Sequence, residues 1–186
     1  MVKIKGLPLL TSKNFILEKY GQGAFDKIIN ALSEEDRKVF SGTILSSEFY
    51  PLDAYVHWLE LEVKLLYNGD ESVLVRQNLE ATEKVFKGIY RVFLYLGSPE
   101  KVLARLGGIN SQIFENLTVQ ATKIEKGKVL LTYTGFQKQH KIFEILVRGF
   151  WVTVLKLMGA KDIKFEPKIT ISDGKDHCEY IVTWTK

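Results

Sequence analysis

Cysteine is almost absent from this sequence. Cys178 is the one cysteine among 186 residues, so the chain can form no intramolecular disulfide and no multi-cysteine zinc or iron–sulfur site. Sparing use of cysteine is typical of proteins in the reducing cytosol. We therefore expect a cytoplasmic protein.

Long apolar runs are also lacking. The apolar stretch near the N-terminus is too short for a signal-peptide core, and the run from Gly149 to Gly159 is interrupted by Lys156. A membrane-spanning helix needs about 20 predominantly apolar residues. The sequence therefore predicts no membrane span.

Charge of one sign does not accumulate along the chain. The formal net charge is +4, but the densest basic group, Lys123, Lys126 and Lys128, contains the acidic Glu125. A phosphate-binding face usually presents Lys and Arg with few acids between them. We expect no nucleic-acid partner.

What is present is an ordinary globular composition, with 46% apolar and 12% aromatic residues. The four prolines are scattered, and no repeat or low-complexity segment marks a linker. The sequence predicts a single domain over residues 1–186, with a helical part at about 6–116 and a part made of a sheet and a helix at about 117–186.

The helical part follows from apolar spacing and from end signals. Ser33 precedes three acidic residues, as an N-cap does, and Pro51 suits the start of a helix. The Gly107-Gly108 pair is predicted to end a short helix. Before these helices, Val2–Lys5 is predicted to be a short edge strand. The helices are expected at 9–20, 24–32, from 34, 51–67, 71–96 and 99–106.

The helix predicted at 51–67 is apolar around most of its circumference. Only a narrow strip with Asp53, His57, Glu60 and Lys64 is polar. A helix of this kind is buried on two sides, so we expect it to be a central element.

From about Leu117 the pattern changes to alternation. Two strands are predicted around a turn at Glu125–Lys128, followed by a helix over Lys141–Met158 and a second pair of strands. The fold class is therefore α+β, with N-terminal helices packed with a C-terminal antiparallel sheet in the order hairpin–helix–hairpin.

His57 is the most tempting reactive residue, since helical spacing places Asp53 and Glu60 on its face. No second histidine or cysteine that would complete a metal site stands near it, and no nucleophile. His140 and His177 lie in predicted loops without a nucleophile elbow, and Cys178 has the parity of a buried strand residue. We expect no metal site and no catalytic residues. An enzyme would have to use His57 or Cys178.

Aromatic side chains with polar tips are concentrated in the predicted interior. An apolar pocket with a few polar groups is typical of small-molecule sites. The candidate lining residues are Trp58, Tyr90, Phe93, Tyr133 and Trp151.

Several short motifs carry a family resemblance. They are Leu17-Glu-Lys-Tyr-Gly21, Phe49-Tyr-Pro51, Gly88-Ile-Tyr90 with Leu96-Gly-Ser-Pro-Glu100, and the terminal run Cys178–Trp184. In their order and spacing the chain resembles a bacterial family of unknown function related to the 4-vinyl-reductase-like domain. That group shares its fold with the heme–nitric-oxide-binding sensor domain and with TRAPP small subunits.

The resemblance implies helices over a sheet, with a pocket for an apolar ligand in many relatives, and sensory or scaffold roles. Where relatives have a further cysteine this chain has Thr170, which argues against a metal or paired-thiol role. The heme-binding branch needs a proximal histidine and a Y-x-S-x-R motif. Helix 99–106 has no histidine, and Tyr133-Thr-Gly-Phe lacks the motif, so we expect no cofactor and consider heme improbable.

The function expected from the sequence is a non-enzymatic domain that binds an apolar small molecule or serves a sensory or regulatory role. The alternative is a dimeric scaffold or protein-interaction module without a ligand, with a homodimer or another protein as partner.

Overall fold

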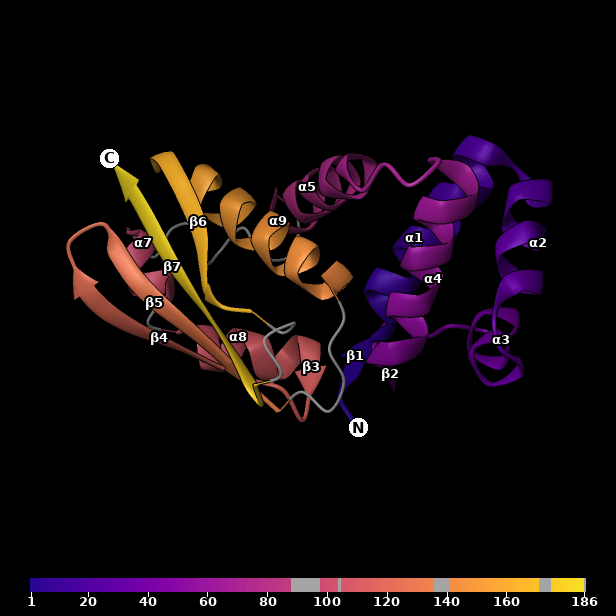
Figure 1. The fold of residues 1–186 in the computed structure, drawn as a ribbon, viewed down its shortest axis with the longest axis horizontal. Helices are drawn as coiled ribbons and strands as arrows, with labels where there is room; N and C mark the ends of the chain where they lie inside the picture. The colour runs from indigo at the N-terminus through magenta and orange to yellow at the C-terminus, as the bar shows by residue number, and fades with distance from the viewer. Residues whose placement is uncertain (88–97, 104, 136–140, 171–174, 186) are drawn as a thin grey trace. The chain divides into compact units, whose positions relative to one another are not determined.

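A computed structural model gives the fold of the chain (Figure 1). It describes residues 1–87, 98–103, 105–135, 141–170 and 175–185. The contacts between residues divide the chain into two compact units. Unit 1 comprises Met1–Leu74 and Gln112–Asn116, and unit 2 comprises Val75–Ser111 and Leu117–Lys186.

Unit 1 contains a small antiparallel sheet formed from segments far apart in the sequence. Its strands are β1 (Lys3–Lys5), β2 (Phe49–Pro51) and β3 (Phe114–Glu115), in the order β2-β1-β3. The prediction that the first strand lies at an edge is wrong. Because β2 and β3 come from distant parts of the chain, nothing local to residues 2–5 indicates that both flank it.

Four helices complete unit 1. They are α1 (Gly6–Tyr20), α2 (Gln22–Ala31), α3 (Glu34–Ser41) and α4 (Leu52–Leu66). The predicted N-cap of α3 is confirmed, because the Ser33 hydroxyl accepts a hydrogen bond from the Asp36 backbone N–H at 3.1 Å. Gly21, with φ +78°, separates α1 from α2.

Helix α4 is largely buried, as its apolar circumference predicts. Trp58 and Val56 are inaccessible to solvent, and the Trp58 ring stacks on Phe40 with 4.4 Å between ring centroids. Glu62, an acidic residue that the sequence did not predict to be buried, is also inaccessible to solvent. The core of unit 1 therefore encloses a carboxyl group.

The helices α5 (Ser72–Lys87), α7 (Pro99–Leu103) and α8 (Leu106–Ile113) lie in the sequence between α4 and β3. The predicted helix at 71–96 is confirmed as far as residue 87; its remainder lies outside the described residues. The predicted stop at Gly107-Gly108 is wrong, since both glycines are inside α8. Each glycine lowers helix stability by about 1 kcal/mol relative to alanine, but α8 buries Ile109 and Asn110.

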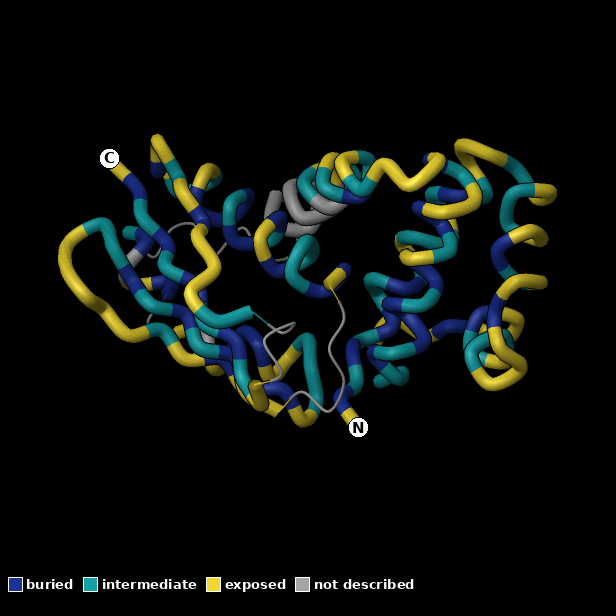
Figure 2. Tube along the Cα trace, viewed as in Figure 1, coloured by how far each residue is buried: buried dark blue, intermediate teal, exposed yellow. Residues whose placement is uncertain are grey.

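Unit 2 is built on a four-stranded antiparallel sheet. The strands β4 (Thr118–Glu125), β5 (Lys128–Thr134), β6 (Lys161–Ile169) and β7 (His177–Thr185) have the order β4-β5-β7-β6. The predicted turn is confirmed, because Glu125 pairs with Lys128 in the ladder and Gly127 has φ +73°. Buried and half-buried residues alternate along β5 and β7, as Figure 2 shows.

Helix α9 (Lys141–Leu157) connects the two hairpins and packs on the sheet. Its Phe143 makes an edge-to-face contact with Tyr133 of β5. The predicted order hairpin–helix–hairpin is thus confirmed. Among the described residues, no helix is long and apolar enough to cross a membrane.

Candidate functional site

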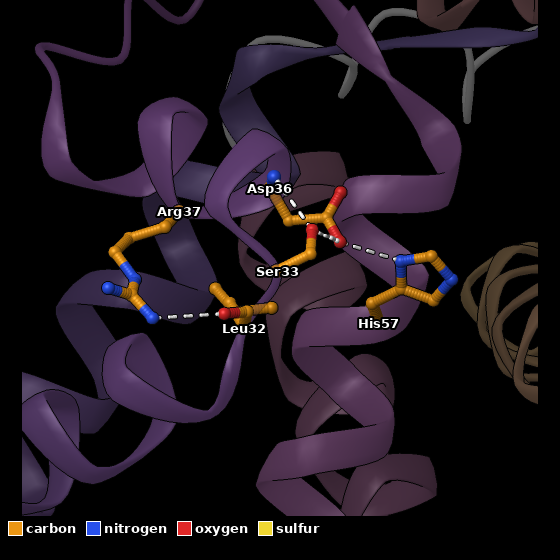
Figure 3. Close-up of polar contacts among 5 residues, drawn as sticks. All are labelled: Leu32, Ser33, Asp36, Arg37 and His57. Carbon is orange, nitrogen blue, oxygen red and sulfur yellow. Dashed lines mark hydrogen bonds and ion pairs between the residues drawn. The ribbon is translucent and has the colours of Figure 1, made fainter.

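His57 forms a hydrogen bond with Asp36, which the sequence did not indicate (Figure 3). Its Nδ1 lies 2.8 Å from Asp36 Oδ2, and the Ser33 hydroxyl donates to the same oxygen at 2.8 Å. The Asp36 side chain is 13% exposed. The N-cap of α3 therefore holds a carboxylate against the histidine of α4, an arrangement that orients the imidazole ring.

Arg37 of α3 forms hydrogen bonds to the C-terminal end of α2, across the turn between the two helices. Its guanidinium donates to the carbonyl oxygens of Ile29, Asn30 and Leu32 at 3.0–3.1 Å, the last of which is drawn in Figure 3. These carbonyls end α2, where partners inside the helix are missing. Arg37 thus fixes the chain on one side of the His57–Asp36 pair.

Glu62 is the polar residue that sequence reasoning missed. Its Oε2 accepts hydrogen bonds from Trp58 Nε1 at 3.2 Å and from the Ser12 hydroxyl at 3.1 Å, and its Oε1 accepts one from Tyr67 at 2.7 Å. One signal was available, because Glu62 follows Trp58 by four residues and so lies on its apolar stripe. Burial, then the nearby Glu62 charge, raises the pKa of Tyr55.

The interior of unit 2 contains a tyrosine–tryptophan hydrogen bond. Trp151 Nε1 of α9 donates to the Tyr133 hydroxyl of β5 at 2.5 Å. Burial is the main cause that raises the pKa of Tyr133. Tyr180 on the neighbouring strand is 2% exposed, and its hydroxyl has no oxygen or nitrogen hydrogen-bond partner in the described part of the chain, with the Cys178 thiol as its polar neighbour.

This contrast predicts opposite effects of removing the two hydroxyls. Tyr133→Phe should lower stability by about 1–2 kcal/mol, because Trp151 Nε1–H loses its acceptor. Tyr180→Phe should be neutral or stabilise by up to about 1 kcal/mol, because a buried hydroxyl without an oxygen or nitrogen partner is removed. Urea unfolding of both variants checks the signs. Equal losses would contradict the assigned hydrogen bonding.

Cys178 lies on the buried face of β7, as predicted, and is inaccessible to solvent. Burial raises the pKa of its thiol to about 11. The thiol is therefore protonated at neutral pH and is a poor nucleophile.

His177 begins β7 on the face opposite Cys178. Its Nδ1 lies 2.8 Å from Asp176 Oδ1, and the hydrogen bond to His177 is the first cause that lowers the pKa of Asp176. The His177 side chain is 29% exposed. His140 lies outside the described residues.

The three described members of the predicted pocket-lining set are distributed over both units. Trp58 belongs to unit 1, whereas Tyr133 and Trp151 are in direct contact in unit 2. Tyr90 and Phe93 lie outside the described residues. The pocket itself stays a prediction. In the described ranges, no three His, Cys, Asp or Glu side chains come together as metal ligands.

The described elements define an α+β protein with a helical unit and an antiparallel sheet covered by a helix. Solved structures similar to this chain include H-NOX proteins. An H-NOX protein from S. oneidensis in the Fe(II)NO ligation state has a TM-score of 0.74 at 11% identity, over 98% of this chain and 100% of that chain. Unliganded Fe(II) H-NOX from K. algicida has a TM-score of 0.73 at 12% identity, over 98% and 97%.

A third H-NOX structure, whose subject is heme distortion in that family, has a TM-score of 0.62 at 14% identity, over 98% and 96% of the two chains. No protein-family model and no curated protein matches the sequence. At these identities the likeness shows the fold. The predicted heme–nitric-oxide-binding fold is confirmed; the predicted relation to the 4-vinyl-reductase-like domain and to TRAPP subunits stays a prediction.

The expectation that the protein takes no cofactor, with heme improbable, is wrong. It relied on two missing sequence motifs. The structural neighbours are H-NOX proteins, and they are described with Fe(II) and heme. Heme is therefore the first cofactor to consider for this fold.

The side chains present allow a test of that cofactor. Proteins hold heme iron by histidine, cysteine thiolate, methionine or tyrosine. Cys178, Tyr133 and Tyr180 do not fit, because burial keeps their acidic protons in place. His177 has the chemistry of such a ligand, because a carboxylate on Nδ1 is the usual support for a histidine whose Nε2 binds a metal, although the Asp176 side chain is 95% exposed. His57 beside Asp36 has the same arrangement.

Proposed function

We propose that this protein is a non-enzymatic sensory domain that binds a small apolar ligand, with heme as the first candidate. The supporting observation is the H-NOX fold, which extends over 98% of this chain. When bound, heme would supply an iron that takes a diatomic gas, as the Fe(II)NO structure does. His177 would hold the iron through Nε2, and Asp176 would orient its ring.

One feature of the site residues supports binding over catalysis. The thiol of Cys178, one of the two residues that an enzyme would have to use, is buried and protonated. The other residue, His57, joins α4 to α3 through its contact with Asp36, which supports a structural role for it.

Heme reconstitution tests the proposal. The protein is expressed with a heme precursor, purified, reduced and scanned for a Soret band, with and without nitric oxide. A Soret band that shifts with nitric oxide is the expected result. His177→Ala should abolish the band or move it, whereas His57→Ala serves as the matched control in unit 1 and should leave it unchanged.

Native mass spectrometry of the fresh protein covers apolar ligands other than heme. If the protein shows no Soret band but a small molecule co-purifies with it, the sensory proposal is kept, with that molecule in place of heme as the ligand. No heme uptake and no bound molecule would reject it. A band lost in His140→Ala and kept in His177→Ala would reject the assigned ligand residue.

The dimeric scaffold without a ligand is the alternative. Light scattering across micromolar concentrations separates the two, since a scaffold of this kind should be a dimer throughout. Cytoplasmic location is also part of the proposal, and it rests on the sparing use of cysteine.

A further inference from the structure

One end of the unit 2 sheet gathers lysines that are far apart in the sequence. Figure 1 shows the β4–β5 turn, the start of β6 and the C-terminal end of β7 at this end. Lys128 of β5 and Lys164 of β6 both pair with Thr183 of β7, on its two sides. Adjacent strands are about 4.8 Å apart, so the two lysines are neighbours across one strand.

The basic cluster, called here the lysine rim, has five members. Lys161 extends it, because it pairs with Thr185, two residues beyond Thr183 on the same face of β7. Lys126 of the turn and Lys123 of β4 are the remaining members; Lys123 pairs with Val129, so it lies on the sheet face opposite Lys128. The lysine rim consists of Lys123, Lys126, Lys128, Lys161 and Lys164.

Most of this charge is uncompensated. Lys128 is paired with Glu125 at 3.3 Å, whereas the other four lysines have no ion-pair partner among the described residues. All four are exposed. Asp162 also lies here and accepts a hydrogen bond from Thr185. Five lysines and two carboxylates leave three positive charges.

An apolar side chain projects from the same place. Ile124 is 50% exposed, and the ladder between β4 and β5 shifts register between Lys123 and Glu125, so that Ile124 has no partner residue. A bulge of this kind changes the direction in which a side chain points. Here the exposed Ile124 stands between Lys123 and Lys126 at the tip of the β4–β5 hairpin.

We infer that the lysine rim with Ile124 docks on an anionic membrane surface. Clusters of lysine are attracted to the negative potential of such a surface, while a projecting apolar side chain enters the interface. Lysine stems also lie along apolar surface while their charged ends stay in water. The partner is a bilayer with acidic headgroups.

Two other classes of partner fit less well. Protein interfaces are enriched in arginine and aromatic residues and depleted in lysine, and the rim contains only lysine. A bulge and a lysine on an edge strand also hinder pairing with another strand. Single-stranded nucleic acid would need exposed aromatic rings for base stacking, and no large aromatic is exposed in the described part of this end.

Sedimentation with vesicles tests the inference. The intact protein is mixed with phosphatidylcholine vesicles that contain phosphatidylserine, and with pure phosphatidylcholine vesicles, at low and high salt. Binding to the phosphatidylserine vesicles alone, weakened by salt, is expected. Each lysine near such a surface contributes about fivefold in affinity. The double variant Lys161→Glu, Lys164→Glu should therefore bind at least roughly 25-fold more weakly.

The matched control is Lys27→Glu, Lys64→Glu, which makes the same charge change on exposed helix positions of unit 1. It should retain binding. Ile124→Ser, which leaves the charge unaltered, should lose about three- to tenfold. Equal binding to both vesicle types, or equal loss in both double variants, overturns the inference. Binding to oligouridylate or to polyglutamate with none to vesicles also overturns it.

Discussion

Glu62→Ala is expected to destabilise unit 1 by about 3–5 kcal/mol, because it removes the buried carboxylate that accepts hydrogen bonds from three side-chain donors. These donors are Trp58 Nε1–H, the Ser12 hydroxyl and the Tyr67 hydroxyl. Trp58 Nε1–H keeps a second acceptor, the Ser12 hydroxyl at 3.0 Å. Glu62 is inaccessible to solvent, so water cannot replace the lost carboxylate without opening the core. Urea unfolding followed by circular dichroism measures the loss.

Two further variants define what the result means. Glu62→Gln keeps one acceptor oxygen but turns an amide donor toward a hydroxyl or an indole, and we expect an intermediate loss of about 2 kcal/mol. Glu18→Ala removes an exposed carboxylate from α1 and should change stability by no more than about 0.5 kcal/mol. A Glu62→Ala loss no larger than that of Glu18→Ala contradicts the assigned network.

Trp151→Ala should destabilise unit 2 by a similar amount, about 3–5 kcal/mol. The indole is 3% exposed, and its N–H is the partner of the Tyr133 hydroxyl. Its removal leaves a cavity between α9 and the sheet and also leaves Tyr133 without that donor. Thermal unfolding should show a lowered midpoint.

The adjacent Phe150 provides the control. Its ring packs edge-to-face on Trp151 with 4.8 Å between centroids, but the residue is only half-buried. Phe150→Ala should therefore cost less, about 1–2 kcal/mol. If Phe150→Ala proves as damaging as Trp151→Ala, then α9 does not face the sheet through Trp151.

The helices and hairpins were predictable because their signals are local. Ser33 caps α3 through a hydrogen bond that spans three residues, and the turn at Glu125–Lys128 lies between two alternating segments. The failures occurred where a distant contact overrides local preference. Strand β1 became central because β2 and β3 arrive from distant parts of the chain, and α8 continues through Gly107 and Gly108.

The candidate site was less predictable, for the same reason. Helical spacing placed Asp53 and Glu60 beside His57, but the observed partner is Asp36, which is 21 residues away and belongs to another helix. The sequence indicated buried aromatic residues correctly for Trp58, Tyr133 and Trp151. It could not indicate that the Tyr133 hydroxyl has an indole N–H donor while the Tyr180 hydroxyl has no nitrogen or oxygen partner among the described residues.

The absence of a sequence motif was weak evidence against heme. The missing histidine in helix 99–106 led to the expectation of no cofactor, yet the chain has the fold of proteins described with Fe(II) and heme. A histidine from another element can supply the chemistry of a missing ligand, and His177 beside Asp176 has that chemistry.

The sequence by itself determined the fold class, the order of hairpin, helix and hairpin, and the burial of Cys178, because periodicity and end signals act over a few residues. Only the tertiary structure decided that Glu62 is buried, that His57 pairs with Asp36, and that Lys128 and Lys164 flank one strand. The physical reason is that side-chain pairing depends on which elements meet, and strand register brings together residues whose separation in sequence carries no signal.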